Sequence, residues 1–215
     1  YFGQDPDELE HSVYDLFAGD AAVSKSLVDK LILNTSNDRV DIIPAATSLA
    51  TLERKAVGQE GLGLQVAKAL RHVQSDYDFV LMDSPPVLGV LMVNALAACH
   101  HLLIPVQTEF LALKGLERMV RTIRMINRAR SRELTYTIIP TFYDRRTQAS
   151  VSSLRELHHR YPEHISNAVV PVDTKFRNAS IEGIVPSQLD PGCRGVHAYA
   201  RLLRSLLESA KQEAS

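Results

Sequence analysis

The stretch from Tyr77 to Leu116 reads YDFVLMDSPPVLGVLMVNALAACHHLLIPVQTEFLALKGL. It opens with an unbroken apolar run, Phe79–Met82, that ends in the carboxylate of Asp83. An apolar run of this length without polar alternation is typical of a strand buried on both faces, as in a parallel sheet. Two prolines follow and end the strand, because proline has no N–H for the sheet ladder. A helical segment at 88–99 and a second apolar run at 102–106 complete a predicted β–α–β unit.

The carboxylate of Asp83 is the first candidate for chemistry. It lies at the predicted carboxyl end of the strand, which is where open α/β sheets bind their ligands. A carboxylate there suits Mg²⁺, which takes one or two carboxylates together with phosphate oxygens and water. The alternative is structural, with Asp83 capping the N-terminus of the next helix.

Three pieces of this stretch resemble one protein family. They are D-S-P-P at 83–86, N-A-L at 94–96 and LIPVQTEFLALKGL at 103–116. Together they resemble the ParA/MinD family of deviant Walker-type ATPases. The resemblance implies that Asp83 is the Walker B aspartate, a catalytic residue that binds Mg²⁺ directly or through water.

Two later segments extend the resemblance. The predicted strand 136–140 ends in TFYDRRT at 141–147, and the predicted last strand, 168–171, ends in V-V-P. The resemblance implies that Thr141, Phe142 and Pro171 lie beside the adenine of ATP, and Val172 and Asp173 are further candidates for nucleotide binding. For Asp173 three roles stay open: a nucleotide contact, a place across a dimer seam, and a helix cap.

The residues after Pro171 depart from the common partition pattern. They read PVDTKFRNAS at 171–180, without the usual arginine after the proline or the usual glutamate before the alanine. This form resembles a ParA-like branch associated with chemotaxis arrays or other polar cargo.

Charge is unevenly distributed along the chain. The whole has a net charge of −1, but 114–160 holds 11 Lys and Arg against 4 Asp and Glu, a net of +7. A long helix predicted at 111–130 places arginines at spacings of three and four on one face, and this face is a candidate for contact with DNA phosphates. The candidate residues are Arg118, Arg121, Arg124 and Arg128, with Arg132 following.

The bulk composition excludes several classes. The chain of 215 residues is 45% hydrophobic and 23% charged, as globular proteins are. Its two cysteines, Cys99 and Cys193, have no metal-binding spacing and indicate reduced thiols in a cytoplasmic protein. No apolar run approaches the ~20 residues of a membrane span. The C-terminal helix has one apolar face, made by Tyr199, Leu203, Leu206, Leu207 and Ala210. It is predicted to pack in the core and not to bind a membrane as in MinD.

The phosphate-binding loop of the family is missing from the sequence. No G-K-[ST] occurs in the 215 residues, and this loop would supply the N–H groups and lysine that hold the phosphates. We therefore expect a chain that begins after roughly 45 residues of family sequence. As given, we expect it to be inactive as an ATPase.

The sequence thus predicts an α/β fold with a mostly parallel sheet flanked by helices, of the P-loop NTPase type with its first strand and P-loop missing. We expect residues 1–215 to form a single, N-terminally truncated ParA-like ATPase domain. The intact protein would bind ATP and Mg²⁺ as a homodimer and position or segregate intracellular cargo with an activating partner or adaptor protein. The alternatives are a non-catalytic docking or regulatory module, and a dinucleotide binder, which the absence of a G-x-G-x-x-G after a strand disfavours.

Overall fold

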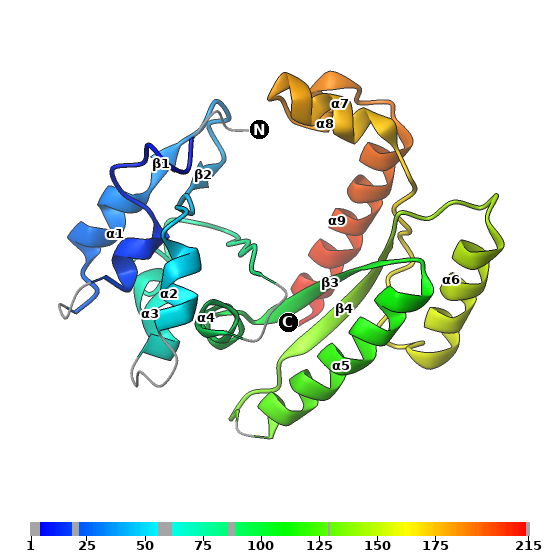
Figure 1. Ribbon diagram of the computed structural model, residues 1–215, viewed down its shortest axis with the longest axis horizontal. Helices are drawn as coiled ribbons and strands as arrows, with labels where there is room; N and C mark the ends of the chain where they lie inside the picture. The colour runs from blue at the N-terminus through cyan, green and yellow to red at the C-terminus, as the bar shows by residue number, and fades with distance from the viewer. Residues whose placement is uncertain (1–4, 19–21, 56–61, 86–88, 129, 214–215) are drawn as a thin grey trace. The chain divides into compact units, whose positions relative to one another are not determined.

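Figure 1 shows the computed structural model of the chain, which describes residues 5–18, 22–55, 62–85, 89–128 and 130–213. The chain forms two compact units, Phe2–Cys99 and His100–Ser215, called here the N-terminal and C-terminal units. Each is described by itself. Within the described parts of the chain, every helix is too short or too polar to cross a bilayer.

The N-terminal unit is mainly helical, with one small antiparallel hairpin. Its hairpin pairs β1 (Leu33–Asn34) with β2 (Asp41–Ile42). Its helices are η1 (Val13–Leu16), α1 (Lys25–Leu31), α2 (Leu49–Lys55), η2 (Leu62–Leu64), α3 (Gln65–Leu70) and α4 (Val90–Ala98). Side chains from η1, α1, α2 and the α3 region form one core: Leu16, Phe17, Val28, Leu31, Leu52, Ala69 and Val73.

Helix α4 is the helix predicted at 88–99, although residue 88 lies outside the described residues. Its Asn94, from the N-A-L motif, is completely buried. The Asn94 side chain accepts a hydrogen bond from Val66 N (3.1 Å) and donates to Leu62 O (2.7 Å) and Val90 O (2.8 Å). Because all its bonds are made to backbone atoms of its own unit, this motif residue serves packing.

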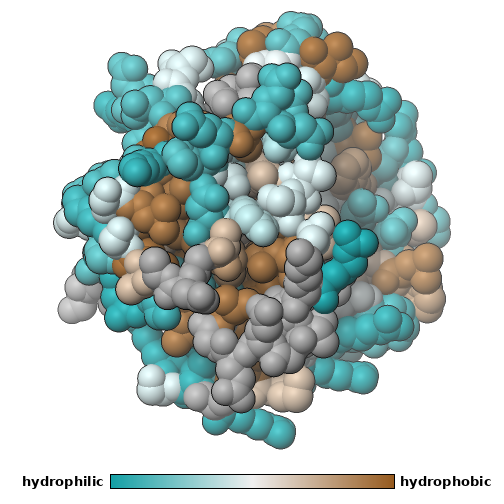
Figure 2. Space-filling model, turned by 60° about the vertical axis from the view of Figure 1, so that its left-hand side comes forward, coloured by the Kyte–Doolittle hydropathy of each residue, from teal (hydrophilic) through white to brown (hydrophobic). Residues whose placement is uncertain are grey.

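The predicted buried strand Phe79–Met82 is wrong. The segment has no strand assignment, and no backbone hydrogen bond joins it to another described segment. Phe79 is 63% exposed and Leu81 is 86% exposed. A strand needs a neighbour for its N–H and C=O groups, and the described residues offer none here. Figure 2 shows hydrophobic residues at the surface among hydrophilic ones on one face of the molecule.

The C-terminal unit contains the sheet that the sequence predicts. Strands β3 (His101–Gln107) and β4 (Thr135–Thr141) pair in parallel, in the register Ile104 to Ile138. The predicted last strand, 168–171, is not assigned as a strand. Two isolated parallel bridges are present instead, one between Ile138 of β4 and Ile165 and one between Tyr143 and Pro171. The helices of this unit are α5 (Phe110–Asn127), α6 (Gln148–Arg160), α7 (Thr174–Glu182), α8 (Pro186–Leu189) and α9 (Arg194–Glu213).

The two faces of this sheet are covered by different helices, as Figure 1 shows. Successive side chains of a strand point to opposite faces, and β4 illustrates this: Ile138 packs with α5 and α6, whereas Ile139 packs with α9. The buried stripe of α5 consists of Leu113, Leu116, Val120 and Ile123.

The predicted core face of α9 is partly wrong. Tyr199 and Leu203 are 46% and 56% exposed, and the buried residues are Ala198 and Leu202. Both stripes are apolar and lie next to each other on the helix, so hydrophobic spacing alone does not choose between them.

Candidate functional site

The carboxyl ends of three parallel segments meet at one edge of the C-terminal unit. Strand β3 ends at Gln107, β4 ends at Thr141, and the third segment ends at Pro171. Tyr143 N donates to Val170 O (3.1 Å) and Tyr143 O accepts from Val172 N (3.1 Å). The structure therefore brings four predicted site residues to this edge: Thr141, Phe142, Pro171 and Val172.

Phe142 has an unusual backbone conformation. Its φ of 51° is the only positive φ of a non-glycine residue in the described chain. A bulky side chain in the left-handed region costs about 1–2 kcal/mol, so the surroundings must hold it there. The ring is 61% exposed despite this constraint. A strained, exposed aromatic at the end of a parallel strand is typical of a ligand-contacting turn.

Two buried hydroxyls lie against this turn, and the sequence did not point to them. Thr108 and Ser150 are 3% and 6% exposed, and their hydroxyl oxygens are 2.8 Å apart. Thr108 Oγ1 lies 3.4 Å from both Thr141 O and Phe142 O, and Asp144 N donates to Ser150 Oγ (3.3 Å). Thr108 lies between Gln107 and Glu109 in the stretch 77–116. An isolated threonine gives no sequence signal of such a role.

Asp144 in the TFYDRRT segment forms a local ion pair. Its Oδ2 lies 2.7 Å from Arg146 Nη2, and its Oδ1 also accepts from Arg146 N (3.0 Å). These hydrogen bonds from Arg146 lower the pKa of Asp144 to about 2. Thr147 then caps α6, with its hydroxyl accepting from Ser150 N (3.3 Å). The polar residues of this motif thus shape the turn between β4 and α6.

Asp173 caps a helix, one of its three predicted roles. Oδ1 accepts from Lys175 N at the start of α7 (3.1 Å), and Oδ2 accepts from Gly195 N at the start of α9 (2.9 Å). The bond from Gly195 N–H is the main cause of its lowered pKa. Both oxygens are engaged, so Asp173 joins two helices; its contact with a nucleotide stays a prediction.

Asp83 lies in the N-terminal unit as an exposed side chain. The alternative in which it caps the next helix is wrong, because α4 begins at Val90 with Gly89 as its N-cap. Glu53 of α2 bonds the helix end, accepting from Leu91 N (3.0 Å). The residues described include no cluster of three or more metal-binding side chains. A lone exposed carboxylate still fits Mg²⁺, whose remaining ligands are phosphate oxygens and water.

The arginine face of α5 is confirmed as a solvent-exposed surface. Arg118, Arg121 and Arg124 are exposed along the helix and Arg128 is exposed at its C-cap. Among the described residues, none of these four is in an ion pair. Their positive charges are therefore available to a polyanion.

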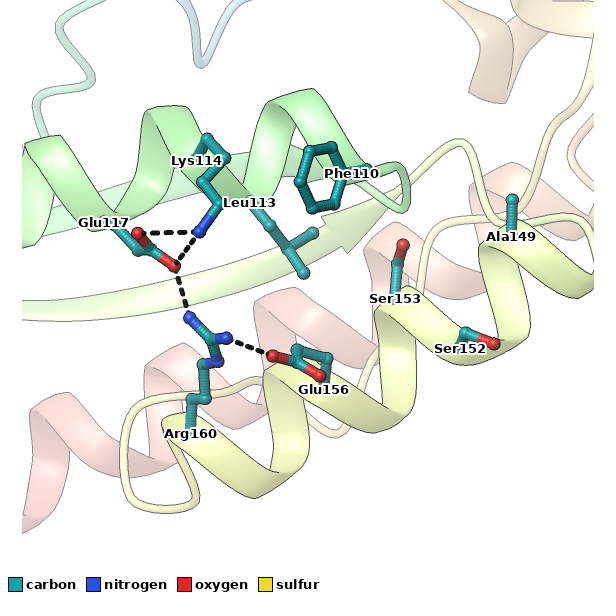
Figure 3. A pocket seen from close by; sticks show the side chains of 9 residues that line it. All are labelled: Phe110, Leu113, Lys114, Glu117, Ala149, Ser152, Ser153, Glu156 and Arg160. Atoms are coloured by element: carbon teal, nitrogen blue, oxygen red, sulfur yellow. Dashed lines mark hydrogen bonds and ion pairs between the residues drawn. The ribbon is translucent and has the colours of Figure 1, made fainter.

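A groove of about 270 Å³ lies between α5 and α6. Figure 3 shows Leu113 of α5 directed toward α6, with Phe110 beside it on α5. Farther along, Glu117 bonds Lys114 (3.2 Å) and Arg160, and Arg160 also pairs with Glu156. The groove combines an apolar end with a charged end whose acids are all paired.

Comparison with known proteins decides the family. The sequence matches the family described as "AAA domain" over residues 1–136, more than half of the chain. It is 30% identical to the chromosome-partitioning ATPase Soj of Treponema pallidum over 197 residues, covering 91% of this chain and 76% of that protein. The chain belongs to the ParA/MinD family of P-loop ATPases.

Other members of this group extend the comparison. The sporulation initiation inhibitor protein Soj of Bacillus subtilis is 30% identical over 200 residues, which cover 93% of this chain and 77% of that protein. Among solved structures, cobyrinic acid a,c-diamide synthase of Mycobacterium smegmatis with bound ATP analogue and magnesium has a TM-score of 0.80 and 28% identity. That match covers 98% of this chain and 77% of the synthase. The predicted α/β P-loop fold is thus confirmed.

Proposed function

We propose that this ParA/MinD-family protein is an ATPase whose ATP-dependent dimerisation and hydrolysis position or segregate intracellular cargo in the cytoplasm. The observation that carries the proposal is its match, over nine-tenths of its length, to a chromosome-partitioning ATPase. The cargo is a plasmid, a chromosome or a polar protein complex.

The proposed cofactors are ATP and Mg²⁺. A solved structure 28% identical to this chain contains an ATP analogue and magnesium. Asp83 would hold the metal, since its exposed carboxylate is the hard ligand that Mg²⁺ prefers. The edge formed by Thr141, Phe142, Pro171 and Val172 would contact the adenine, and Asp173 would lie nearby.

In such a site the protein contributes chiefly positioning and charge neutralisation. The Mg²⁺ neutralises developing phosphate charge when bound. Of this chain's own residues, Asp83 would orient the metal through its carboxylate, and Phe142 would orient the base through its exposed ring. Because the 215 residues contain no G-K-[ST], we propose that by themselves they do not turn over ATP.

The arginine face of α5 supports DNA as a partner. Each arginine that contacts a phosphate contributes about −0.9 to the slope of log affinity against log salt. Arg121→Ala and Arg124→Ala together should make the slope shallower by about 2 units. Arg155→Ala, an exposed arginine of α6, is the matched control and should leave the slope unchanged. Equal slopes for the paired variant and the control would contradict the DNA surface.

A second candidate function is a non-catalytic docking module. The groove between α5 and α6 favours it, because an apolar end beside a charged rim suits a protein segment with one apolar anchor. An adaptor protein bound there is also compatible with the ATPase.

Dimerisation tests these two functions against each other. The protein extended upstream by the first strand and a G-K-[ST] loop is passed through size-exclusion chromatography with light scattering, with and without ATP, Mg²⁺ and DNA. The ATPase proposal expects dimers only with ATP and Mg²⁺. Monomers under all conditions would overturn it in favour of the docking module.

A further inference from the structure

The turn that carries Phe142 is held at each of its four backbone positions. Thr108 N donates to Thr141 O (3.1 Å), and Tyr143 makes two backbone bonds of 3.1 Å to the third parallel segment. Thr108 Oγ1 is 3.4 Å from Phe142 O, and Ser150 Oγ accepts from Asp144 N (3.3 Å). The Phe142 side chain is 61% exposed.

The two hydroxyls can satisfy all these groups as one chain of hydrogen bonds. Asp144 N–H donates to Ser150 Oγ, Ser150 O–H donates to Thr108 Oγ1, and Thr108 O–H donates to the carbonyl of Thr141 or Phe142. Each hydroxyl then donates once and accepts once. Since both side chains are over nine-tenths buried, water cannot replace a missing member at low cost.

We propose that Thr108 and Ser150 are positioning residues that hold Phe142 in its left-handed conformation, with its ring presented to a purine base. This inference rests on the proposed nucleotide function. Left-handed backbone is unfavourable for phenylalanine, so the turn relaxes when the chain of hydroxyls is broken. The ring then moves away from the base, and affinity falls for the base and not for the phosphates.

Thr108 offers a matched pair of substitutions. Thr108→Val keeps the shape and removes the hydroxyl, whereas Thr108→Ser keeps the hydroxyl and removes only a methyl. The first readout, on the 215-residue chain, is hydrogen exchange of the two hydrogen-bonded amides of the turn, Tyr143 and Asp144. Loss of a neutral buried hydrogen bond should speed exchange there by roughly 5- to 10-fold in Thr108→Val and leave Thr108→Ser near the original rate.

The second readout is nucleotide affinity in the protein extended by a G-K-[ST] loop. Thr108→Val should weaken ATP binding by roughly 5- to 10-fold, leave inorganic tripolyphosphate binding unchanged, and be rescued in Thr108→Ser. If Thr108→Val does not fold, Ser150→Ala breaks the same chain and is measured in its place.

The outcomes separate this inference from the function on which it rests. Unchanged exchange at Tyr143 and Asp144 would overturn the holding role of the hydroxyls. Faster exchange with unchanged ATP affinity would overturn the positioning of the base. If the unsubstituted extended protein binds ATP no better than tripolyphosphate, the base site itself is wrong, and the proposed function fails with it.

Discussion

Asn94 of the N-A-L motif gives a sharp test of the packing in the N-terminal unit. Asn94→Ala removes the donor to Leu62 O (2.7 Å) and the acceptor for Val66 N (3.1 Å). Each unsatisfied buried group costs about 1–3 kcal/mol, and the bond to Val90 O adds little because that carbonyl keeps its helical partner. Leu62 and Val66 are only partly buried. We therefore expect the free energy of unfolding to fall by about 2–4 kcal/mol.

Two further variants serve as the comparison and the control for this measurement. Asn94→Asp still accepts from Val66 N, but it cannot donate to Leu62 O and it buries a carboxylate at a fully buried position. Because an unpaired buried charge costs more than a lost neutral hydrogen bond, Asn94→Asp should be destabilised at least as much as Asn94→Ala. Val93→Ala, at a 43% exposed position on the same helix, should change stability by less than about 0.5 kcal/mol. Urea unfolding followed by circular dichroism gives the free energies, and exchange of the Val66 amide assigns the loss to this unit. A change below about 0.5 kcal/mol in Asn94→Ala would refute the reasoning.

Three other predictions follow from the structure. Phe142→Gly relieves the left-handed strain, so thermal unfolding should show stability unchanged or raised by about 1 kcal/mol, while ATP affinity of the loop-containing protein falls. A carbon-detected NMR titration should place the pKa of Asp144 at about 2, and Arg146→Ala should raise that pKa toward the ordinary 3.8. Because the pKa of Asp144 is lowered in the folded state, its pair with Arg146 stabilises the fold above pH 3.8. This stabilisation is lost as the pH falls through 2. The hydrogen bond to Asp41 raises the pKa of Tyr77 to about 12, so its contribution to stability is full below pH 10 and is lost as pH rises toward 12. Ultraviolet titration should show Asp41→Asn lowering that pKa, and an unchanged titration would contradict the pair.

Elements with strong local patterns could be predicted from the sequence. The stripe of α5 and the short apolar runs of β3 and β4 depend on residues that repeat at the helical or strand period. Phe79–Met82 has an equally apolar pattern and still forms no strand, because pairing depends on a distant neighbour and not on the run itself.

The candidate site was predicted only in part. Resemblance placed Thr141, Phe142, Pro171 and Val172, and the parallel register brings them to one edge. The positive φ of Phe142 and the pair of buried hydroxyls could not be predicted from the sequence. The bonds of Thr108 to Thr141 O and to Ser150 Oγ join residues 33 and 42 positions apart, which local spacing does not report.

The metal role of Asp83 is tested most directly by ATP turnover in the protein extended with its phosphate-binding loop. Asp83→Asn keeps the size of the side chain and removes the charge that Mg²⁺ requires, and Asp78→Asn, an exposed aspartate five positions earlier, is the matched control. The account predicts that Asp83→Asn lowers the rate by about 100-fold or more while Asp78→Asn turns over ATP at the original rate. Undiminished turnover in Asp83→Asn would contradict it.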